Sequence, residues 1–331
     1  MVIKELTVPF RIFMDIALLR RTPSHHLKKR YIEEDLTKRK VGYRGEQTLK
    51  YYLEFIPDND YYIFHNIRLK CGVHIFQIDT LILTPNFILI IEVKNYSGTL
   101  IFEKHSDQLI RIYQNKEEIF PNPIFQVQRH QIQLERLLKQ YNLPTLPIEH
   151  IVIISNSSTQ IKTSQNNLQI YEKVLHPEKI ISKMEELINR YKEIKIKPHT
   201  LKKISQLLHS KHIPDIPNIT KLFEIPKHEI IKGIQCPSCL NYPMIRKHGT
   251  WYCPICHDTS KDAHAQAILD YFLLIEPTIT NRKCQEFILY SNRKIVTNLL
   301  SSMNLPISGN DGGRKYLRPP IQYFQDTFTP I

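Results

Sequence analysis

The stretch FQIDTLILTPNFILIIEVKN, residues 76–95, holds two apolar runs that are typical of neighbouring β-strands. Between them lies TPN, a combination that favours a turn. Charged side chains nevertheless interrupt both runs: Asp79 stands in the first, and Glu92 and Lys94 stand in the second. An unpaired charge is costly to bury, so these side chains must lie at a strand end, pair together, or hold a cation.

The three charged residues form a specific chemical set. Two carboxylates, here Asp79 and Glu92, can bind Mg²⁺ or Mn²⁺, hard cations that accept oxygen ligands and keep several waters. The neighbouring Lys94 could orient or deprotonate a metal-bound water and offset the charge of a phosphate. Taken alone, the pattern is equally compatible with a Glu-Lys pair on a solvated sheet edge.

The surrounding sequence predicts a mixed α/β domain. Strands are expected at residues 61–69, 74–83, 87–95 and 149–155, with a hairpin formed by residues 98–104 and 109–116. Residues 121–141, a segment from about Ile32 to Phe55, and Glu178 to about Tyr191 show helical spacing of apolar residues. The run EHIVIIS is typical of a strand buried on both faces.

Four motifs in this region resemble a known family. They are GYRGE at residues 42–46, QID at 77–79, IEVKNYSG at 91–98 and NPIFQ at 122–126. Their order and spacing resemble the nuclease-related domain (NERD) family, which is similar to PD-(D/E)XK nucleases with a restriction-endonuclease-like core. The resemblance covers about residues 40–155. The N-terminal stretch IKELTVPFRI also looks like that of bacterial NERD proteins of the Bacillus type.

The resemblance implies a role for each matching residue. Asp79 and Glu92 would bind Mg²⁺ or Mn²⁺, and Lys94 would be the catalytic lysine. Glu46, near the start of the first core helix, would complete the metal site. Gln126, on the second core helix, would position the substrate.

The resemblance also covers positions with other expected roles. The carbonyl of Val93 is a candidate third metal ligand, whereas Gln77 stands where the family commonly has an acidic residue. Gly42 and Gly45 are expected to allow a close backbone approach. His130 follows Gln126 at i+4 on a polar stripe that is expected to be a solvated face.

Four of the six cysteines form two closely spaced pairs, CPSC and CPIC, thirteen residues apart. This layout is that of a tetrahedral zinc site made of two knuckles with a hairpin between them, as in zinc ribbons. Cys71 and Cys284 have no partner at ligand spacing and are expected to be small apolar residues. The expected zinc ligands are Cys236, Cys239, Cys253 and Cys256.

The hairpin between the knuckles allows two interpretations. Arg246, Lys247 and Trp251 could bind nucleic acid, with a base stacked on the aromatic ring and cations close by. Alternatively, the zinc site is only a structural staple for a fragment too small to form its own core.

The C-terminal segment also allows two interpretations. One helix is expected from about Asn281, with a break at residues 290–291, followed by a second helix and a glycine-rich hairpin. This order resembles a winged helix-turn-helix, whose second helix enters a DNA groove and whose wing contacts phosphate. The alternative is a plain helical cap with a loose basic tail. The DNA contacts expected in the first case are Arg293, Lys294, Arg314 and Lys315.

Composition indicates the class of partner. The chain of 331 residues carries a formal net charge of +13, with a basic excess at both ends, which suits a polyanion. Charged residues interrupt the first twenty positions, and no window reaches the roughly 18–20 apolar residues of a membrane span. We therefore expect a cytoplasmic protein with a polyanionic partner and no membrane contact. The nuclease resemblance implies that this partner is nucleic acid, DNA rather than RNA.

The expected organisation has five parts. An N-terminal extension (1–35) precedes the nuclease-like domain (36–195), a linker (196–231), the zinc ribbon (232–260) and a helical, winged-helix-like module (261–331). The leading hypothesis is a metal-dependent nuclease acting on DNA. The alternatives are a non-catalytic nucleic-acid-binding protein on a nuclease scaffold and a zinc-dependent protein-interaction adaptor. The oligomeric state is left open.

Overall fold

The chain folds into two compact units, as seen in a computed structural model that describes residues 1–57, 61–164, 167–310 and 313–327. The first unit consists of Met1–Thr7 and Val41–Asp215. The second consists of Val8–Lys40 and Ile216–Ile331. Each unit has hydrophobic clusters of its own, and each is built from segments that lie far apart in the sequence.

The first unit contains two sheets and the helices that flank them. Its strands are β1 (Val2–Lys4), β2 (Tyr62–Cys71), β3 (His74–Leu83), β4 (Ile88–Lys94), β5 (Thr99–Phe102), β6 (Gln108–Tyr113), β7 (Lys116–Pro121), β8 (Ile148–Ile154), β9 (Gln160–Thr163) and β10 (Val174–Leu175). Its helices are the latter part of α2 (Lys29–Leu53), then α3 (Pro123–Gln140), α4 (Gln169–Lys173), η1 (Pro177–Lys179), α5 (Ile180–Arg190) and α6 (Pro198–Ser210).

The larger sheet has six strands in the order β1-β2-β3-β4-β8-β10. The β2, β3 and β4 strands pair antiparallel, while β1 pairs with β2, β8 with β4, and β10 with β8 in parallel. At the centre, β4 and β8 are each apolar at five of their seven positions, as is typical of strands covered on both faces. The sheet is therefore mixed, and the strands expected from the sequence are confirmed.

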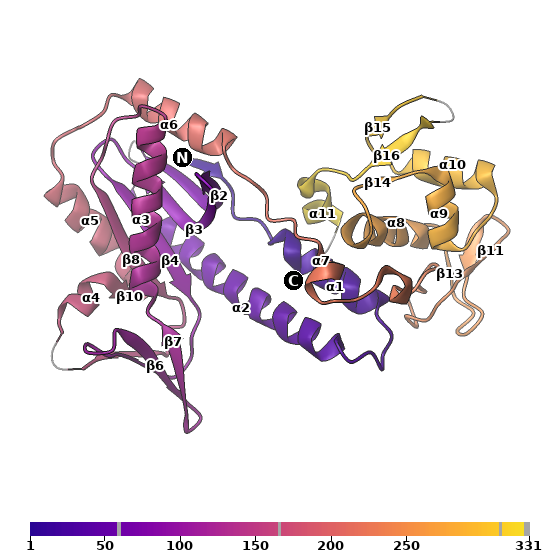
Figure 1. Cartoon of the computed structure of the whole chain (residues 1–331), viewed down its shortest axis with the longest axis horizontal. Coiled ribbons are helices and arrows are strands. Elements are labelled where there is room, and N and C mark those ends of the chain that lie inside the picture. The colour runs from indigo at the N-terminus through magenta and orange to yellow at the C-terminus, as the bar shows by residue number, and fades with distance from the viewer. Residues whose placement is uncertain (58–60, 165–166, 311–312, 328–331) are drawn as a thin grey trace. The chain divides into compact units, whose positions relative to one another are not determined.

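Helices cover both faces of this sheet (Figure 1). Because side chains alternate along a strand, Leu81 and Leu83 pack with one set of helices, while Ile82 packs with the other. The first set is α3 and α6, and the second is α2 and α5. This arrangement confirms the predicted fold class, a mixed sheet flanked by helices.

A smaller sheet joins β4 to α3. It has the order β7-β6-β5-β9, and the predicted hairpin is its β5–β6 pair. The edge strand β7 leads directly into the cap of α3, where the side chain of Asn122 accepts a hydrogen bond from the N–H of Ile124. This connection fixes the start of the helix that carries Gln126.

Two domain boundaries differ from the expectation. Residues 198–210, expected in a linker, form α6, and its Leu201, Ile204 and Leu208 are buried in the core of the first unit. The N-terminal extension is divided: β1 joins the large sheet, and the following residues belong to the second unit. Both segments carry apolar side chains that are covered by parts of the chain far away in the sequence.

The second unit combines helices with two three-stranded sheets. Its helices are α1 (Phe10–Arg21), the first part of α2, α7 (Ile219–Leu222), η2 (Lys227–Glu229), α8 (Ala263–Leu274), α9 (Asn281–Ile288), α10 (Arg293–Ser302) and α11 (Ile321–Thr327). Its strands are β11 (Ile245–Lys247), β12 (Thr250–Tyr252), β13 (Thr259–Ser260), β14 (Thr278–Ile279), β15 (Ile307–Ser308) and β16 (Lys315–Leu317). Among all the helices described in the chain, none is long and apolar enough to cross a membrane.

The core of the second unit depends on α1. This helix buries Phe10, Phe13 and Leu18 in one cluster with residues of α8 and the cysteine hairpin. A buried ion pair also joins α1 to α8. Nε of Arg21 donates to Asp270 at 2.8 Å, and both side chains are fully buried. The N-terminal segment is thus a structural part of the second unit.

The C-terminal part has the winged-helix order of helix, strand, helix, helix, strand, strand. These elements are α8, β14, α9, α10, β15 and β16, and β16 pairs with both other strands. The predicted break between the helices is a left-handed Leu289, after which Asn292 caps α10. The expected wing is the β15–β16 hairpin, and its residues 311–312 lie outside the described residues. Because the strands pair, the alternative of a loose tail is wrong.

Candidate active site and cysteine cluster

The candidate site lies where β3 separates from β4. The recorded pairing of these strands ends at Thr80 and Ile91, so Asp79 stands opposite Glu92 just beyond the last pair. There the carboxylate of Asp79 accepts a hydrogen bond from the N–H of Val93 at 2.9 Å. The Asp79 side chain thus replaces a backbone acceptor for the N–H of Val93. This explains how an aspartate is accommodated in an apolar sheet.

Three side chains meet beside Asp79. The ammonium of Lys94 donates to Oε1 of Glu92 at 2.7 Å and to Oε1 of Gln126 at 3.1 Å. The amide of Gln126 in turn donates to the same oxygen of Glu92 at 2.7 Å. Glu92 is 3% exposed, so this closed triangle gives two donors to one oxygen of a carboxylate that is almost fully out of water.

Glu46 approaches the same region from α2. Its carboxylate accepts a hydrogen bond from the side-chain amide of Asn66 on β2. The helix can come this close because a Cβ on Gly45 would lie 2.6 Å from Oγ of Ser155, the residue after β8. Gly45 therefore has the expected close approach, whereas nothing lies within 4 Å of a Cβ on Gly42.

The carboxylates repel one another electrostatically. Burial, with a smaller contribution from the charge of Glu92, raises the pKa of Glu46 to about 7, against the hydrogen bond from Asn66 and the charge of Lys4. Burial raises the pKa of Asp79 well above its usual range, and the charges of Glu92 and Glu46 add to the effect. This mutual influence places the three acidic groups in one electrostatic site.

Lys94 is the protonated lysine of the site. Burial lowers the pKa of Lys94, but the charge of Glu92, its hydrogen bond and the charge of Asp79 together raise it above the usual value. At neutral pH the side chain therefore donates hydrogen bonds and carries a positive charge.

Sequence reasoning underrated two neighbours of the site. His130, expected on a solvated face, is 8% exposed, and its Nδ1 lies 4.0 Å from Oε2 of Glu92. That expectation was wrong because the helix turns this position toward Phe76, whose ring centroid lies 6.0 Å away. Asn66 was missed, although a hairpin turning at Gly72 would place it opposite Asp79.

The donor set fits a hard divalent cation. The acidic oxygens are the ligand type that Mg²⁺ and Mn²⁺ prefer. A cation there would offset the burial that raises the pKa values of Asp79 and Glu92, and also the repulsion from Glu92 and Glu46 that adds to the effect at Asp79. Across the described parts of the chain, however, only the four cysteines form a group of three or more potential ligand atoms within 4.8 Å of one another. Glu46 is thus near the Asp79-Glu92 pair without closing a cage around it.

The comparison with family models agrees with this geometry, because the region matched contains the whole network of Glu46, Asp79, Glu92, Lys94 and Gln126. Residues 41–155 match the nuclease-related domain family. The resemblance found in the sequence motifs is thereby confirmed for the part of the chain that holds the candidate site. The matched region is therefore nuclease-related.

One known protein is similar to part of the chain. An uncharacterized protein of Bacillus anthracis is 25% identical over 136 residues, which are 41% of this chain and 60% of that protein. The match therefore spans less than two thirds of the relative. No solved structure matches the chain significantly.

Outside the nuclease-related domain, the cysteines converge as predicted. Their four sulfurs all lie within 4.8 Å of one another, and the pairs Cys236–Cys256 and Cys239–Cys253 are each 3.5 Å apart. Zn–S bonds of about 2.3 Å in a tetrahedron imply sulfur separations of about 3.8 Å, so the cluster could hold zinc. Two knuckles joined by the β11–β12 hairpin give the zinc-ribbon arrangement.

The expected stacking role of Trp251 is wrong. The side chain points into the core and is 1% exposed, with its N–H donated to His264 at 3.2 Å. One face is covered by the guanidinium of Arg246, 4.7 Å from the ring centroid. Along β12 the side chains alternate, so Tyr252 faces outward instead, with Nζ of Lys247 4.0 Å from its centroid.

The predicted contacts of the winged helix are accessible. Arg293 and Lys294 are exposed in the first turn of α10, and Arg314 and Lys315 are exposed on the wing. Their role in binding stays a prediction.

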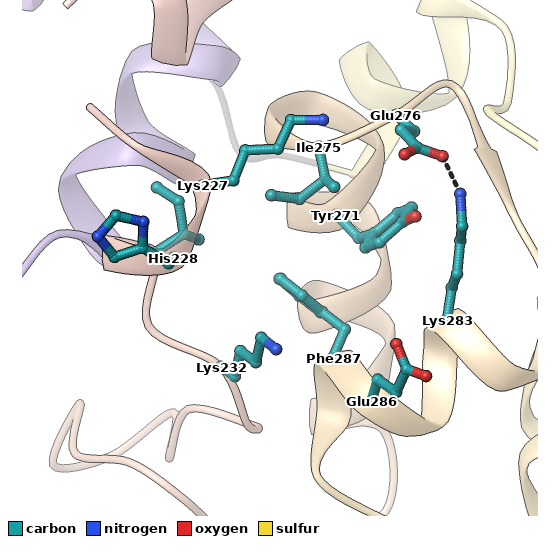
Figure 2. Close-up of a pocket in the computed structure, with 10 residues that line it drawn as sticks. Lys227, His228, Lys232, Tyr271, Ile275, Glu276, Lys283, Glu286 and Phe287 are labelled. Carbon is teal, nitrogen blue, oxygen red and sulfur yellow. Dashed lines mark hydrogen bonds and ion pairs between the residues drawn. The ribbon is translucent and has the colours of Figure 1, made fainter. Parts of the chain in front are cut away.

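The second unit also contains a pocket of about 310 Å³ between η2, α8 and α9. Figure 2 shows Tyr271 and Phe287 at its centre, with Lys227 and Lys232 on one side. Across the pocket, Lys283 bonds to Glu276. None of the residues predicted from the sequence as site residues lines this pocket, so it is distinct from the candidate active site.

Proposed function

We propose that the first unit is a metal-dependent nuclease that hydrolyses phosphodiester bonds in nucleic acid, DNA in preference to RNA. The observation that carries the proposal is the hydrogen-bonded triangle of Glu92, Lys94 and Gln126 directly beside Asp79. A lysine held against a buried carboxylate at the open end of a sheet is suited to a negatively charged substrate.

Asp79 and Glu92 would hold Mg²⁺ or Mn²⁺, with Glu46 as the next carboxylate. When bound, such a cation polarises the phosphodiester and lowers the pKa of water to make a nucleophile. The ammonium of Lys94 would offset negative charge that develops on the phosphate and orient the water by donating to it. Gln126, bonded to both Glu92 and Lys94, would keep that ammonium in place.

The proposal is tested with the purified full chain on single-stranded DNA, double-stranded DNA and RNA. We expect cleavage with added Mn²⁺ or Mg²⁺ and none without, and the activity should co-elute with the 39.2 kDa chain. Loosely bound cations should be removed by gel filtration, because a strong chelator would also strip the cysteine cluster. Cleavage that does not depend on Mn²⁺ or Mg²⁺, or no cleavage of any substrate, would reject the proposal.

We also propose that the second unit holds nucleic acid through its winged helix, with zinc in the cysteine cluster. Support comes from four exposed cations on two elements that contact DNA in winged helices. The residues are Arg293, Lys294, Arg314 and Lys315. Lys247 on the zinc ribbon would add a further phosphate contact.

Changing these four cations to glutamine should weaken DNA binding uniformly across sequences. Each phosphate contact contributes about 0.9 to the slope of log K against log salt, so the slope should fall by about 3 to 4. Binding is measured by fluorescence anisotropy in an Asp79→Asn background, which avoids cleavage. The control changes Lys202 and Lys203, exposed on α6, to glutamine. If that control lowers affinity and slope as much per charge as the four changes, the winged helix is not the binding site.

The two alternative functions predict different results in these experiments. A non-catalytic binding protein would retain DNA but cleave nothing, and it would have no reason to bind Mn²⁺ at Asp79. A protein-interaction adaptor would not retain nucleic acid at physiological salt.

A further inference from the structure

The strand β2 changes conformation at Asn66, opposite the candidate site. Pairing with β3 is recorded for His65 with Thr80 and for Ile67 with Ile78, but not for Asn66 with Asp79 between them. Asn66 has φ of 50°, in the left-handed region, which asparagine tolerates better than most other residues. A left-handed residue in the middle of a strand costs both strain and ladder hydrogen bonds. Proteins keep such unfavourable local conformations mainly at functional sites.

The side chain of Asn66 has a defined orientation. Its N–H donates to Oε2 of Glu46, and its carbonyl oxygen accepts from Nε2 of Gln77 at 3.0 Å. Because one end of the amide meets a carboxylate and the other meets an amide donor, flipping it would break both bonds. The chain Gln77–Asn66–Glu46 therefore links β3, β2 and α2.

Glu46 depends on this amide. Among the residues that the structure describes, Asn66 is the one hydrogen-bond donor to the Glu46 side chain. The nearby ammonium of Lys4 is directed elsewhere, since it donates to the backbone carbonyl of His65 at 2.8 Å. Without the amide of Asn66, the carboxylate would be free to rotate away from Asp79 and Glu92.

We propose that Asn66 is a positioning residue that holds Glu46 as the third carboxylate of the cation site. This inference rests on the proposed function, because it assumes that Asp79 and Glu92 bind a divalent cation. Residues that orient ligands by hydrogen bonds typically change metal affinity about 10- to 100-fold when they are removed. Asn66 is expected to act in this range through Glu46, without touching the substrate.

The test compares Mn²⁺ binding by titration calorimetry in the full chain and its Asn66→Gly variant. Glycine readily adopts the left-handed conformation, so this change removes the side-chain amide of Asn66 without requiring a new backbone conformation. We expect the Mn²⁺ affinity to fall about 10-fold. The matched control is Asn142→Gly, because Asn142 is also left-handed with φ of 51° but is exposed. This control should bind Mn²⁺ like the unchanged protein.

A double-variant cycle separates positioning from general damage. If Asn66 acts through Glu46, Asn66→Gly should lower the Mn²⁺ affinity no further in a Glu46→Gln background. Additive losses in the two variants would overturn the inference, and so would an Asn66→Gly variant that binds Mn²⁺ as tightly as the unchanged protein. If the unchanged protein binds no Mn²⁺ at all, the proposed function fails together with the inference. If the unchanged protein binds and cleaves, a failure concerns Asn66 alone.

Discussion

Lys94→Met should lower the rate of cleavage at least about 100-fold while leaving Mn²⁺ affinity equal or higher. Methionine keeps the length of the side chain but removes the ammonium that bonds to Glu92 and Gln126. Because that positive charge lies beside the two carboxylates, its loss favours binding of a cation even as catalysis fails. Asp79→Asn should lose both cleavage and Mn²⁺ binding. Single-turnover cleavage and calorimetry on the same preparations measure the two quantities.

The controls for Lys94→Met and Asp79→Asn are variants of the same unit. Lys116→Met, at an exposed position of β7, and Asp107→Asn, at an exposed position just before β6, make the same chemical changes and should leave both quantities unchanged. A Lys94→Met variant with normal cleavage would remove the lysine from the mechanism. One that loses Mn²⁺ binding as fully as Asp79→Asn would instead assign Lys94 a structural role.

Removing zinc should unfold the cysteine hairpin and strongly destabilise the second unit. Structural zinc sites contribute about 10 to 16 kcal/mol of binding free energy that is also folding free energy. Cys236, Cys253 and Trp251 belong to the main core cluster of this unit, so the loss extends beyond the hairpin. The chain has one tryptophan, which makes Trp251 a local probe. On chelation or in Cys239→Ser, its emission should move to longer wavelength as the ring enters water.

The same preparations should contain one zinc ion per chain before chelation, as measured by atomic absorption. The control Cys71→Ser changes a half-buried cysteine on β2 in the first unit, and it should alter neither zinc content nor emission. A Trp251 spectrum that is insensitive to chelation would contradict a structural zinc site.

Much of the central fold could be predicted because its signals are local. The runs that became β2, β3, β4 and β8 are long and rich in branched residues, and their spacing allows few arrangements. The four cysteines were predictable for the same reason, since ligand spacing within each pair determines the knuckle. In the candidate site, Asp79, Glu92 and Lys94 came from one stretch, residues 76–95, and the family resemblance added Glu46 and Gln126.

The wrong predictions concern tertiary contacts and strand register, which a local sequence pattern does not determine. The α6 helix lies among lysines and prolines, and only its contact with a distant sheet shows that Leu201 and Ile204 are core residues. Trp251 and Tyr252 are adjacent on a short strand, so a shift of one residue decides which ring is buried. Asn66 has low strand propensity and gave no signal until the hairpin register placed it opposite Asp79.

The divided second unit has a consequence for the order in which a ribosome makes its parts. The α1 helix is synthesised early, but α8, which covers its apolar side, follows about 240 residues later, or roughly 10 to 50 s at usual rates of elongation. During this interval the part of the core that α8 contributes next to α1 has not yet been made, whereas the first unit can already close its sheet. A nascent chain of this kind is a natural client for chaperones that shield exposed apolar helices.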